Sequence, residues 1–162
     1  MVDTLAREWA QRAQDLPYAD PYEALVMASI IERETGLPSE RNEIAGVFVR
    51  RLQKGMRLQT DPTVIYGLGE AFDGKLRRTH LADGNIPYKA SRHHGLPPTP
   101  IALPGRAAFR AALHPAAGQA RFFGARGDGG HVFSETLAEH ERAVRKYQLR
   151  RREDYRSSPP RK

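Results

Sequence analysis

Two glutamates separated by a single residue, Glu32 and Glu34, follow a long apolar stretch and precede a glycine. If that stretch is helical, both carboxyl groups lie at its C-terminal end, beside apolar side chains. These surroundings disfavour the negative charge of a carboxylate, so the acid keeps its proton to a higher pH than in water. A carboxylic acid that is protonated near neutral pH can act as a general acid. The pattern therefore makes both residues candidate catalytic acids.

Helical geometry does not choose between the two glutamates. At about 100° per residue, Glu34 falls beside Met27 and Glu32 falls beside Leu25, so each adjoins apolar neighbours. Each also has an ordinary alternative role, because charged residues in the last turn of a helix commonly pair with a nearby cation such as Arg33. The residues alone leave both the choice and this alternative open.

The helix that must position these acids has clear boundaries in the sequence. Asp20 is a suitable N-cap, Pro21 fits the first helical position, and Glu23 completes a capping box. Residues 24–31 are apolar on nearly every side except for one serine, which indicates a helix buried in a core. Gly36 supplies the left-handed residue that commonly follows a helix end. We therefore predict a buried helix with the two acids in its last turn.

A second stretch with the chemistry of a binding site runs from residue 55 to residue 69. Within it, Gln59, Thr60, Asp61 and Tyr66 offer hydrogen-bond donors, an acceptor and an aromatic ring. Sugar-binding sites use groups of these kinds. The alternative is that Thr60 or Asp61 caps a short helix that follows, with Tyr66 in the core. The spacing favours neither interpretation.

The remaining elements are predicted from periodicity, caps and turn residues. A helix over residues 1–16 is closed by Pro17. A second helix, capped by Ser39 and stopped by Gly55, forms a helical hairpin with the buried one. Further along we expect a short helix over 106–113, a β-hairpin that turns at 127–129, and a C-terminal helix capped by Thr136 with Leu137, Val144 and Tyr147 facing inward.

Composition argues against several classes of protein. The 162 residues suffice for one domain, there is no cysteine for a disulfide, and no apolar run is long enough to cross a bilayer. Of the 26 Lys and Arg residues, nine lie from position 142 onward beside two of the 19 acidic residues, so the net charge of +7 belongs to the C-terminal tail. The neutral body argues against nucleic acid as a partner.

No metal or other cofactor is expected. The adjacent histidines His93 and His94 point apart in an extended chain, and no carboxylate or cysteine pattern accompanies them. The sequence contains neither a phosphate-binding loop motif nor a dinucleotide-binding glycine motif after a strand. We therefore predict chemistry carried by protein side chains alone.

Six blocks of the sequence match the pattern of one bacterial family. They are A-S-I-I-E-R-E-T at 28–35, S-E-R at 39–41, G-M-R-L-Q-T-D-P-T-V-I-Y-G at 55–67, G-L-P-P-T-P-I at 95–101, H-P-A at 114–116 and G-D-G-G-H-V-F-S-E-T-L-A-E-H at 127–140. The match as a whole covers roughly residues 20–148, and the block at 55–67 is long enough to be highly specific. On these blocks the chain resembles the YceG-like (MltG) endolytic murein transglycosylases.

The resemblance implies an α+β fold: a mainly helical, lysozyme-like catalytic core with a small β-hairpin and a C-terminal helix. It implies an enzyme that cuts the β-1,4 bond between N-acetylmuramic acid and N-acetylglucosamine in nascent glycan strands and leaves a 1,6-anhydromuramyl end. In lytic transglycosylases a small hydroxyl residue follows the catalytic glutamate, so the resemblance assigns the general acid and base to Glu34, with Glu32 as second choice. Substrate binding is assigned to Gln59, Thr60, Asp61, Tyr66 and Tyr88.

Two other interpretations of the resemblance stay open. One is a non-catalytic glycan-binding or scaffold module of the same fold, and the other is a conventional muramidase-type hydrolase. The chain also departs from the family pattern at two places: it has Tyr88-Lys89-Ala90-Ser91 where the family usually has Y-N-T-Y, and Gly124-Ala125-Arg126-Gly127 where the family tends to have V-A-D-G.

The resemblance also implies a cellular context. We expect residues 1–19 to form a helical connector, 20–150 the catalytic domain, and 151–162 a basic, frayed tail. Family members carry a membrane helix and a LysM-like region before this domain. The full-length protein is therefore expected at the periplasmic face of the cytoplasmic (inner) membrane, with this part soluble and the membrane contacted only through an N-terminal anchor. The expected partners are peptidoglycan glycan strands and cell-wall synthesis enzymes.

Overall fold

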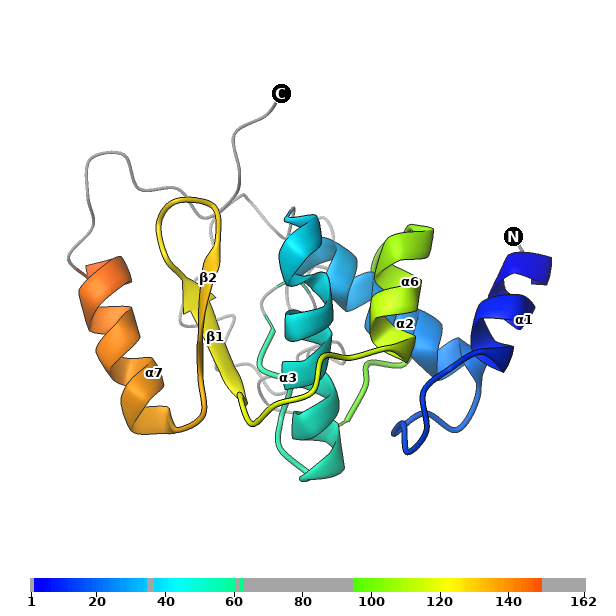
Figure 1. The fold of residues 1–162 in the computed structure, drawn as a ribbon, viewed down its shortest axis with the longest axis horizontal. Helices are drawn as coiled ribbons and strands as arrows, with labels where there is room; N and C mark the ends of the chain where they lie inside the picture. The colour runs from blue at the N-terminus through cyan, green and yellow to red at the C-terminus, as the bar shows by residue number, and fades with distance from the viewer. Residues whose placement is uncertain (1, 35–36, 61, 63–94, 150–162) are drawn as a thin grey trace.

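The computed structural model describes residues 2–34, 37–60, 62 and 95–149, and Figure 1 shows its α-helices and two-stranded sheet. The helices are α1 Val2–Ala10, α2 Pro21–Glu34, α3 Arg41–Gln53, α6 Arg106–Leu113 and α7 Leu137–Val144, with a 3₁₀ turn at Pro38–Glu40 and a π-helical turn at Arg145–Leu149. The strands β1 Phe122–Ala125 and β2 His131–Ser134 pair antiparallel. Helices α1, α2, α3 and α6 gather in one part of the molecule, and the hairpin with α7 forms the other end. The predicted α+β class, mainly helical with a small sheet, is confirmed.

Helix α2 begins at the predicted capping box. Asp20 Oδ1 accepts the backbone N–H of Glu23 at 2.9 Å. The Glu23 carboxylate in turn accepts the backbone N–H of Ala19 at 3.3 Å. Two of the N–H groups near the helix start are thereby satisfied by side chains.

The buried stretch of α2 is the centre of the core. Every residue from Val26 to Ile31 is buried, as the sequence predicts. Helix α6 packs against this stretch through the small residues Ala108, Ala111 and Ala112, which let the two helices approach closely. Complete burial of an isoleucine or leucine side chain contributes roughly 1.5–3 kcal/mol to stability, so this contact stabilises the helical part strongly.

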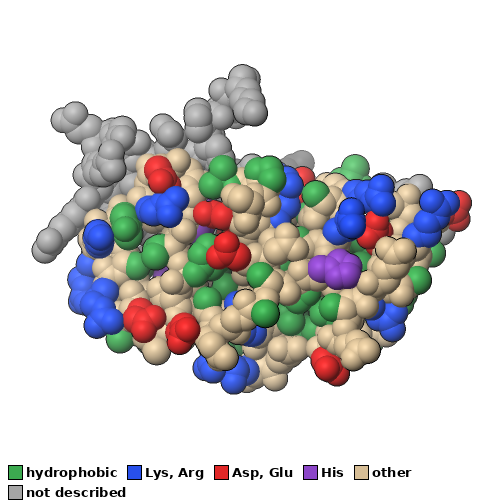
Figure 2. Space-filling view, viewed as in Figure 1, with side chains coloured by type: hydrophobic (Ala, Val, Ile, Leu, Met, Phe, Trp, Pro, Cys, Tyr) green, Lys and Arg blue, Asp and Glu red, His purple; other side chains and the backbone are tan. Residues whose placement is uncertain are grey.

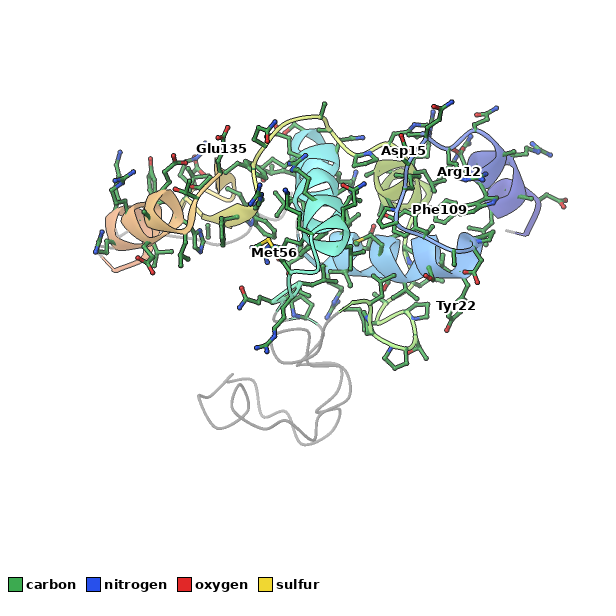
Figure 3. All side chains as sticks on the ribbon, turned by 90° about the horizontal axis from the view of Figure 1, so that it is seen from below. Arg12, Asp15, Tyr22, Met56, Phe109 and Glu135 are labelled. Carbon is green, nitrogen blue, oxygen red and sulfur yellow. The ribbon has the colours of Figure 1, made fainter. Side chains whose placement is uncertain are left out.

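A buried carboxylate holds α1 on the same core. Glu8 is 4 % exposed, and its oxygens lie 2.9 Å from Arg106 and 3.4 Å from Arg110 of α6. Figure 3 shows Phe109 of α6 on the side that faces α1. An unpaired carboxylate at this depth would be destabilising, so the two arginines fix the position of α1.

The prediction of a helix over residues 1–16 is wrong beyond Ala10. The backbone N–H of Ala13 donates to the Leu113 carbonyl of α6 at 3.0 Å instead of continuing a helix. Asp15 then takes a left-handed backbone conformation with φ of 60°. A tertiary contact therefore overrides the local helical pattern.

Helix α3 also departs from the prediction. Ser39 is not its N-cap but lies inside the 3₁₀ turn, and the N-cap is Glu40, whose side chain makes no capping bond. Helix α3 leaves the end of α2 at a steep angle (Figures 1 and 3), so the predicted helical hairpin is wrong. The predicted stop is confirmed, because Gly55 follows the helix with a left-handed φ of 68°.

A close approach of two backbones sets the path of α3. A Cβ atom on Gly46 would lie 2.6 Å from the carbonyl oxygen of Ala116, in the segment after α6. Asn42 contributes to the same contact, since its side-chain amide donates to the His114 carbonyl at 2.8 Å. Helix α3 is therefore positioned by the chain that follows α6 rather than by α2 alone.

Helix α7 packs against the hairpin and is less buried than predicted. Thr136 caps it as expected, with its Oγ1 accepting the backbone N–H of Glu139 at 3.2 Å. Val144 and Tyr147 are half-buried, but Leu137 is 56 % exposed, so its predicted inward position is wrong. The hairpin is too narrow to cover a whole helix face, and no described residue of α7 is fully buried.

One face of the molecule carries charged side chains of both signs, which Figure 2 shows interspersed. Within the described ranges, none of the helices has the length and apolar character needed to span a bilayer.

Ser29 generates a first prediction, because it joins α2 to the segment 95–105. Its buried hydroxyl donates to the Val26 carbonyl at 2.6 Å and accepts the backbone N–H of Ile101 at 3.0 Å. Ser29→Ala leaves that buried N–H without this acceptor, so the free energy of unfolding should fall by about 1–3 kcal/mol in urea titrations. The exposed Ser39→Ala is the matched control and should change it by less than about 0.5 kcal/mol. Equal effects of the two variants would contradict the prediction.

Candidate active site

A cleft of about 920 Å³ lies at the C-terminal end of α2. Its described walls come from α2, α3, the segment that includes Gln59 and Pro62, the β-hairpin and α7. The polar side chains that line it and matter most for chemistry are Glu34, Arg51, Gln59, His131 and His140. The cleft is therefore assembled from segments far apart in the sequence.

Glu34 is the last residue of α2 and is half-buried in the wall of this cleft. The hydroxyl of Thr60, which is 3 % exposed, donates a hydrogen bond to Glu34 Oε1. Two residues from separate candidate motifs, 26 positions apart, are thus in direct contact. A carboxyl oxygen bonded in this way has a defined orientation toward the cleft.

The turn that brings Thr60 to Glu34 depends on a strained residue. Gln59 has a left-handed φ of 53°, which in residues other than glycine costs of order 1–3 kcal/mol. Its neighbour Leu58 is completely buried, whereas the Gln59 side chain is exposed and lines the cleft. Backbone strain of this kind is concentrated at functional sites in proteins.

Arg51 is a buried cation next to the candidate acid. It is 6 % exposed, its Nε donates to the Arg121 carbonyl at 2.6 Å, and its Nη1 donates to the Leu58 carbonyl. Burial lowers the pKa of Arg51 to about 10, and the charge of Glu34 acts in the opposite direction. The guanidinium therefore stays protonated at neutral pH and attracts a negative charge on Glu34.

The ring of Phe122 contacts both this arginine and a histidine. The Arg51 guanidinium lies 5.3 Å from the centre of the Phe122 ring, and the His140 ring stacks on it at 5.4 Å. Burial and the charge of Arg51 lower the pKa of His140, while Glu141 opposes the shift. The His140 Nδ1 atom is buried and has no hydrogen-bond partner among the described residues. His140 therefore favours its neutral form in the cleft.

The family model for the YceG-like family matches residues 1–146 of this sequence. The chain belongs to the YceG-like family. In the endolytic murein transglycosylase of Bacillus subtilis (strain 168), 126 residues are 43 % identical, covering 78 % of this chain and 34 % of that protein. In the protein of the same name from Streptococcus pneumoniae (strain D39), 126 residues are 30 % identical, covering 75 % of this chain and 23 % of that protein.

A solved structure of another YceG-like protein has the same fold. The crystal structure of a YceG-like protein from Listeria monocytogenes superposes with a TM-score of 0.72 at 38 % identity. The superposition covers 87 % of this chain and 43 % of that chain. This YceG-like chain thus spans less than half the length of each of these three relatives.

The side chain of the second candidate acid, Glu32, points to the start of α6 and not to the cleft that Glu34 borders. Its Oε2 accepts the backbone N–H of Gly105 at 3.4 Å, at the start of α6. It is half-buried there and is not among the described residues that line the cleft. Of the two acids in this turn of the YceG-like chain, Glu34 is the one that borders the cleft.

Three of the predicted binding residues lie outside the described residues. They are Asp61, Tyr66 and Tyr88, which stay predictions. Gly36, predicted to follow the helix end, lies outside them as well. No group of three or more His, Cys, Asp and Glu side chains in the described ranges could hold a metal ion.

Sequence reasoning missed two of the polar residues in this cleft, Arg51 and His131. Arg51 lies in the last turn of the helix that Gly55 stops, where a basic residue is ordinary, yet it is buried and donates to the carbonyls of Arg121 and Leu58. His131 received no role, although it lies in one of the six sequence blocks and lines the cleft. For His131 the available signal was its place in the block at 127–140, whereas Arg51 lies outside all six blocks and nothing in the sequence marked it.

His140 generates a prediction on pH dependence. Its pKa in the folded chain lies below the ordinary value of 6.5, so the unfolded chain binds more protons just below that pH. The free energy of unfolding should therefore fall as the pH is lowered from about 6.5. His140→Phe keeps the ring stacked on Phe122 without this titration, so its stability should fall less over the same range.

Urea unfolding at pH 7.5, 6.5 and 5.5 measures this difference. The exposed His114→Phe is the matched control for removal of one histidine. A His140→Phe variant with the same pH dependence as the parent would contradict the assignment.

Proposed function

We propose that this chain is the catalytic part of an endolytic peptidoglycan lytic transglycosylase. The observation that carries the proposal is the Glu34 carboxyl group, which ends a buried helix, accepts a bond from Thr60 and borders a large cleft. The names of the Bacillus and Streptococcus relatives support this reaction class. The substrate we infer is a nascent, uncrosslinked glycan strand, cut between N-acetylmuramic acid and N-acetylglucosamine so that elongation ends.

In the proposed reaction Glu34 first acts as a general acid. It donates its proton to the glycosidic oxygen, and the bond between that oxygen and C1 of N-acetylmuramic acid breaks. The C6 hydroxyl oxygen of the same sugar forms the new bond to C1, and its proton passes to the Glu34 carboxylate. No water is consumed, and the acid is regenerated.

The surroundings of Glu34 suit the carboxylate that exists between these two proton transfers. The Thr60 hydroxyl donates to it, and the buried guanidinium of Arg51 supplies a positive charge that needs no rearrangement. Preorganised groups of this kind stabilise charge that develops during a reaction. We therefore assign Thr60 to the orientation of Glu34 and Gln59 to contact with the sugar.

The acids of the cleft favour a lyase over a conventional hydrolase. A hydrolase of the usual kind needs a second carboxylate across the scissile bond. The other carboxylate among the described cleft residues is Glu141, which is exposed on α7 and interacts with His140, so it is not held in place as the second acid of a hydrolase would be. The intramolecular hydroxyl of the substrate makes a second carboxylate unnecessary.

The proposal includes the setting of the reaction. The substrate is made at the outer face of the cytoplasmic membrane, so we infer that the whole protein acts on the periplasmic side, near cell-wall synthesis enzymes. The bond chemistry described above calls for no cofactor.

Glu34→Gln tests the proposed acid. Mass spectrometry of products from uncrosslinked, lipid-linked strands should detect 1,6-anhydromuramyl ends with the parent. The variant should make them at least about 10²-fold more slowly, because the amide cannot transfer the proton. Glu32→Gln, two residues earlier, is the matched control and should retain the parent product. Reducing ends from the parent would indicate a hydrolase, and loss of product only in Glu32→Gln would transfer the role to that residue.

Thr60→Val tests the group that orients the acid. Valine has the same shape without the hydroxyl, so kcat should fall about tenfold while KM changes little. Steady-state rates of anhydromuramyl release measure both parameters. The matched control is Thr4→Val, at a half-buried position on α1 remote from the cleft. Unchanged kcat in Thr60→Val would exclude the proposed role of this hydroxyl.

A further inference from the structure

A second carboxylate in this fold holds a histidine in the wall of the same cleft. Glu40, in the turn before α3, and His131, the first residue of β2, are 8 % and 9 % exposed. Glu40 Oε2 lies 2.7 Å from His131 Nδ1, and Glu40 Oε1 accepts the backbone N–H of His131 at 2.8 Å. Both carboxylate oxygens of Glu40 are thus hydrogen-bonded to the same residue, His131, which lies 91 positions later in the sequence.

The bonds to Glu40 determine which atom His131 can offer to a ligand. A carboxylate only accepts hydrogen bonds, so Nδ1 carries the hydrogen in this contact. The remaining ring nitrogen, Nε2, is the polar atom with which His131 can act in the cleft that it lines. Phe123 packs edge-on against the ring at 5.4 Å and restricts its rotation.

The hairpin turn fits closely over Glu40. A Cβ atom on Gly130 would lie 3.1 Å from Glu40 Oε1 and 2.7 Å from Arg126 Nη2. Asp128 closes the turn by accepting the Gly130 backbone N–H at 2.9 Å and pairing with Arg126 at 3.0 Å. The turn therefore holds the start of β2, and His131 with it, in one place against the carboxylate.

The strand register separates His131 from the proposed acid. His131 pairs with Ala125, whereas Phe122, which contacts Arg51 beside Glu34, pairs with Ser134. Three residues of strand correspond to about 10 Å at roughly 3.3 Å per residue. His131 therefore lies three strand residues away from the part of the hairpin that contacts Arg51, and we take its ligand to be a sugar next to the one that meets Glu34.

We propose that His131 is a glycan-binding residue of this cleft, and that Glu40 is its positioning residue. Nε2 of His131 forms a hydrogen bond with a polar group of a sugar next to the one that meets Glu34. Glu40 acts only through His131, by fixing the ring and keeping the hydrogen on Nδ1. The inference rests on the proposed function, because it takes a glycan strand as the ligand.

Two substitutions separate this role from a purely structural one. His131→Asn keeps a donor at the position of Nδ1, and with it the bond to Glu40, but has no atom at the position of Nε2. His131→Gln reaches the position of Nε2 but loses the donor at Nδ1. We therefore expect His131→Asn to lose more glycan affinity than His131→Gln, and His131→Gln to lose more stability than His131→Asn.

The experiment measures binding of fluorescently labelled, uncrosslinked glycan strands by anisotropy, in the Glu34→Gln background so that no strand is cut. His131→Asn should weaken binding about tenfold, which corresponds to one lost hydrogen bond, and His131→Gln by no more than about threefold. In thermal unfolding, His131→Gln should lower Tm by about 2–4 °C, and His131→Asn should melt near the Glu34→Gln parent.

Each outcome decides the inference. The crossed pattern, with affinity lost in one variant and stability in the other, supports it. A His131→Asn variant that binds as tightly as the Glu34→Gln parent overturns it and leaves the proposed reaction intact. If every variant that loses affinity also has a lowered Tm, the inference is likewise overturned, because Glu40 and His131 would then serve only to hold the hairpin against the helical part. Absence of strand binding by the Glu34→Gln parent overturns both the proposed substrate and this inference.

Discussion

A buried guanidinium joins the segments that make the cleft. Arg51 is 6 % exposed, and a charge at that depth is tolerated only where acceptors and an opposite charge surround it. The carbonyls of Leu58 and Arg121 provide the acceptors, and Glu34 provides the opposite charge. These three groups belong to different parts of the chain. They satisfy Arg51 only when the end of α2, the segment after α3 and the start of the hairpin meet at one point, and that point is the cleft.

The hairpin is held against the helical part at two places. At one end the Arg121 carbonyl accepts a bond from Arg51, and at the other end Glu40 holds the backbone and ring of His131. Between them, Phe123 packs edge-on against Phe48 of α3 at 5.5 Å. One wall of the cleft is therefore rigidly placed relative to α2, while α7, which has no fully buried residue in the described part, forms the less buried wall.

The sequence by itself determined the elements that depend on near neighbours. The caps at Asp20 and Thr136 and the hairpin turn at 127–129 are confirmed, because each joins residues no more than a few positions apart. The burial of α2 was also predicted correctly, because its central residues are apolar on nearly every side of the helix. The sequence also singled out Glu34 and Thr60, although it left Glu32 as an equal candidate on geometry alone.

Only the tertiary structure decided how these elements meet. It ended α1 at Ala10 through a contact with α6, and it turned α3 away from α2, where the sequence predicted a longer helix and a helical hairpin. It placed Glu34 on the cleft and Glu32 elsewhere, and it buried Arg51 and paired Glu40 with His131. Arg51 and Arg121, whose carbonyl it binds, are 70 positions apart in the sequence, and Glu40 and His131 are 91 positions apart. No periodicity or cap connects such residues along the chain, so only the packing of the whole fold brings them together.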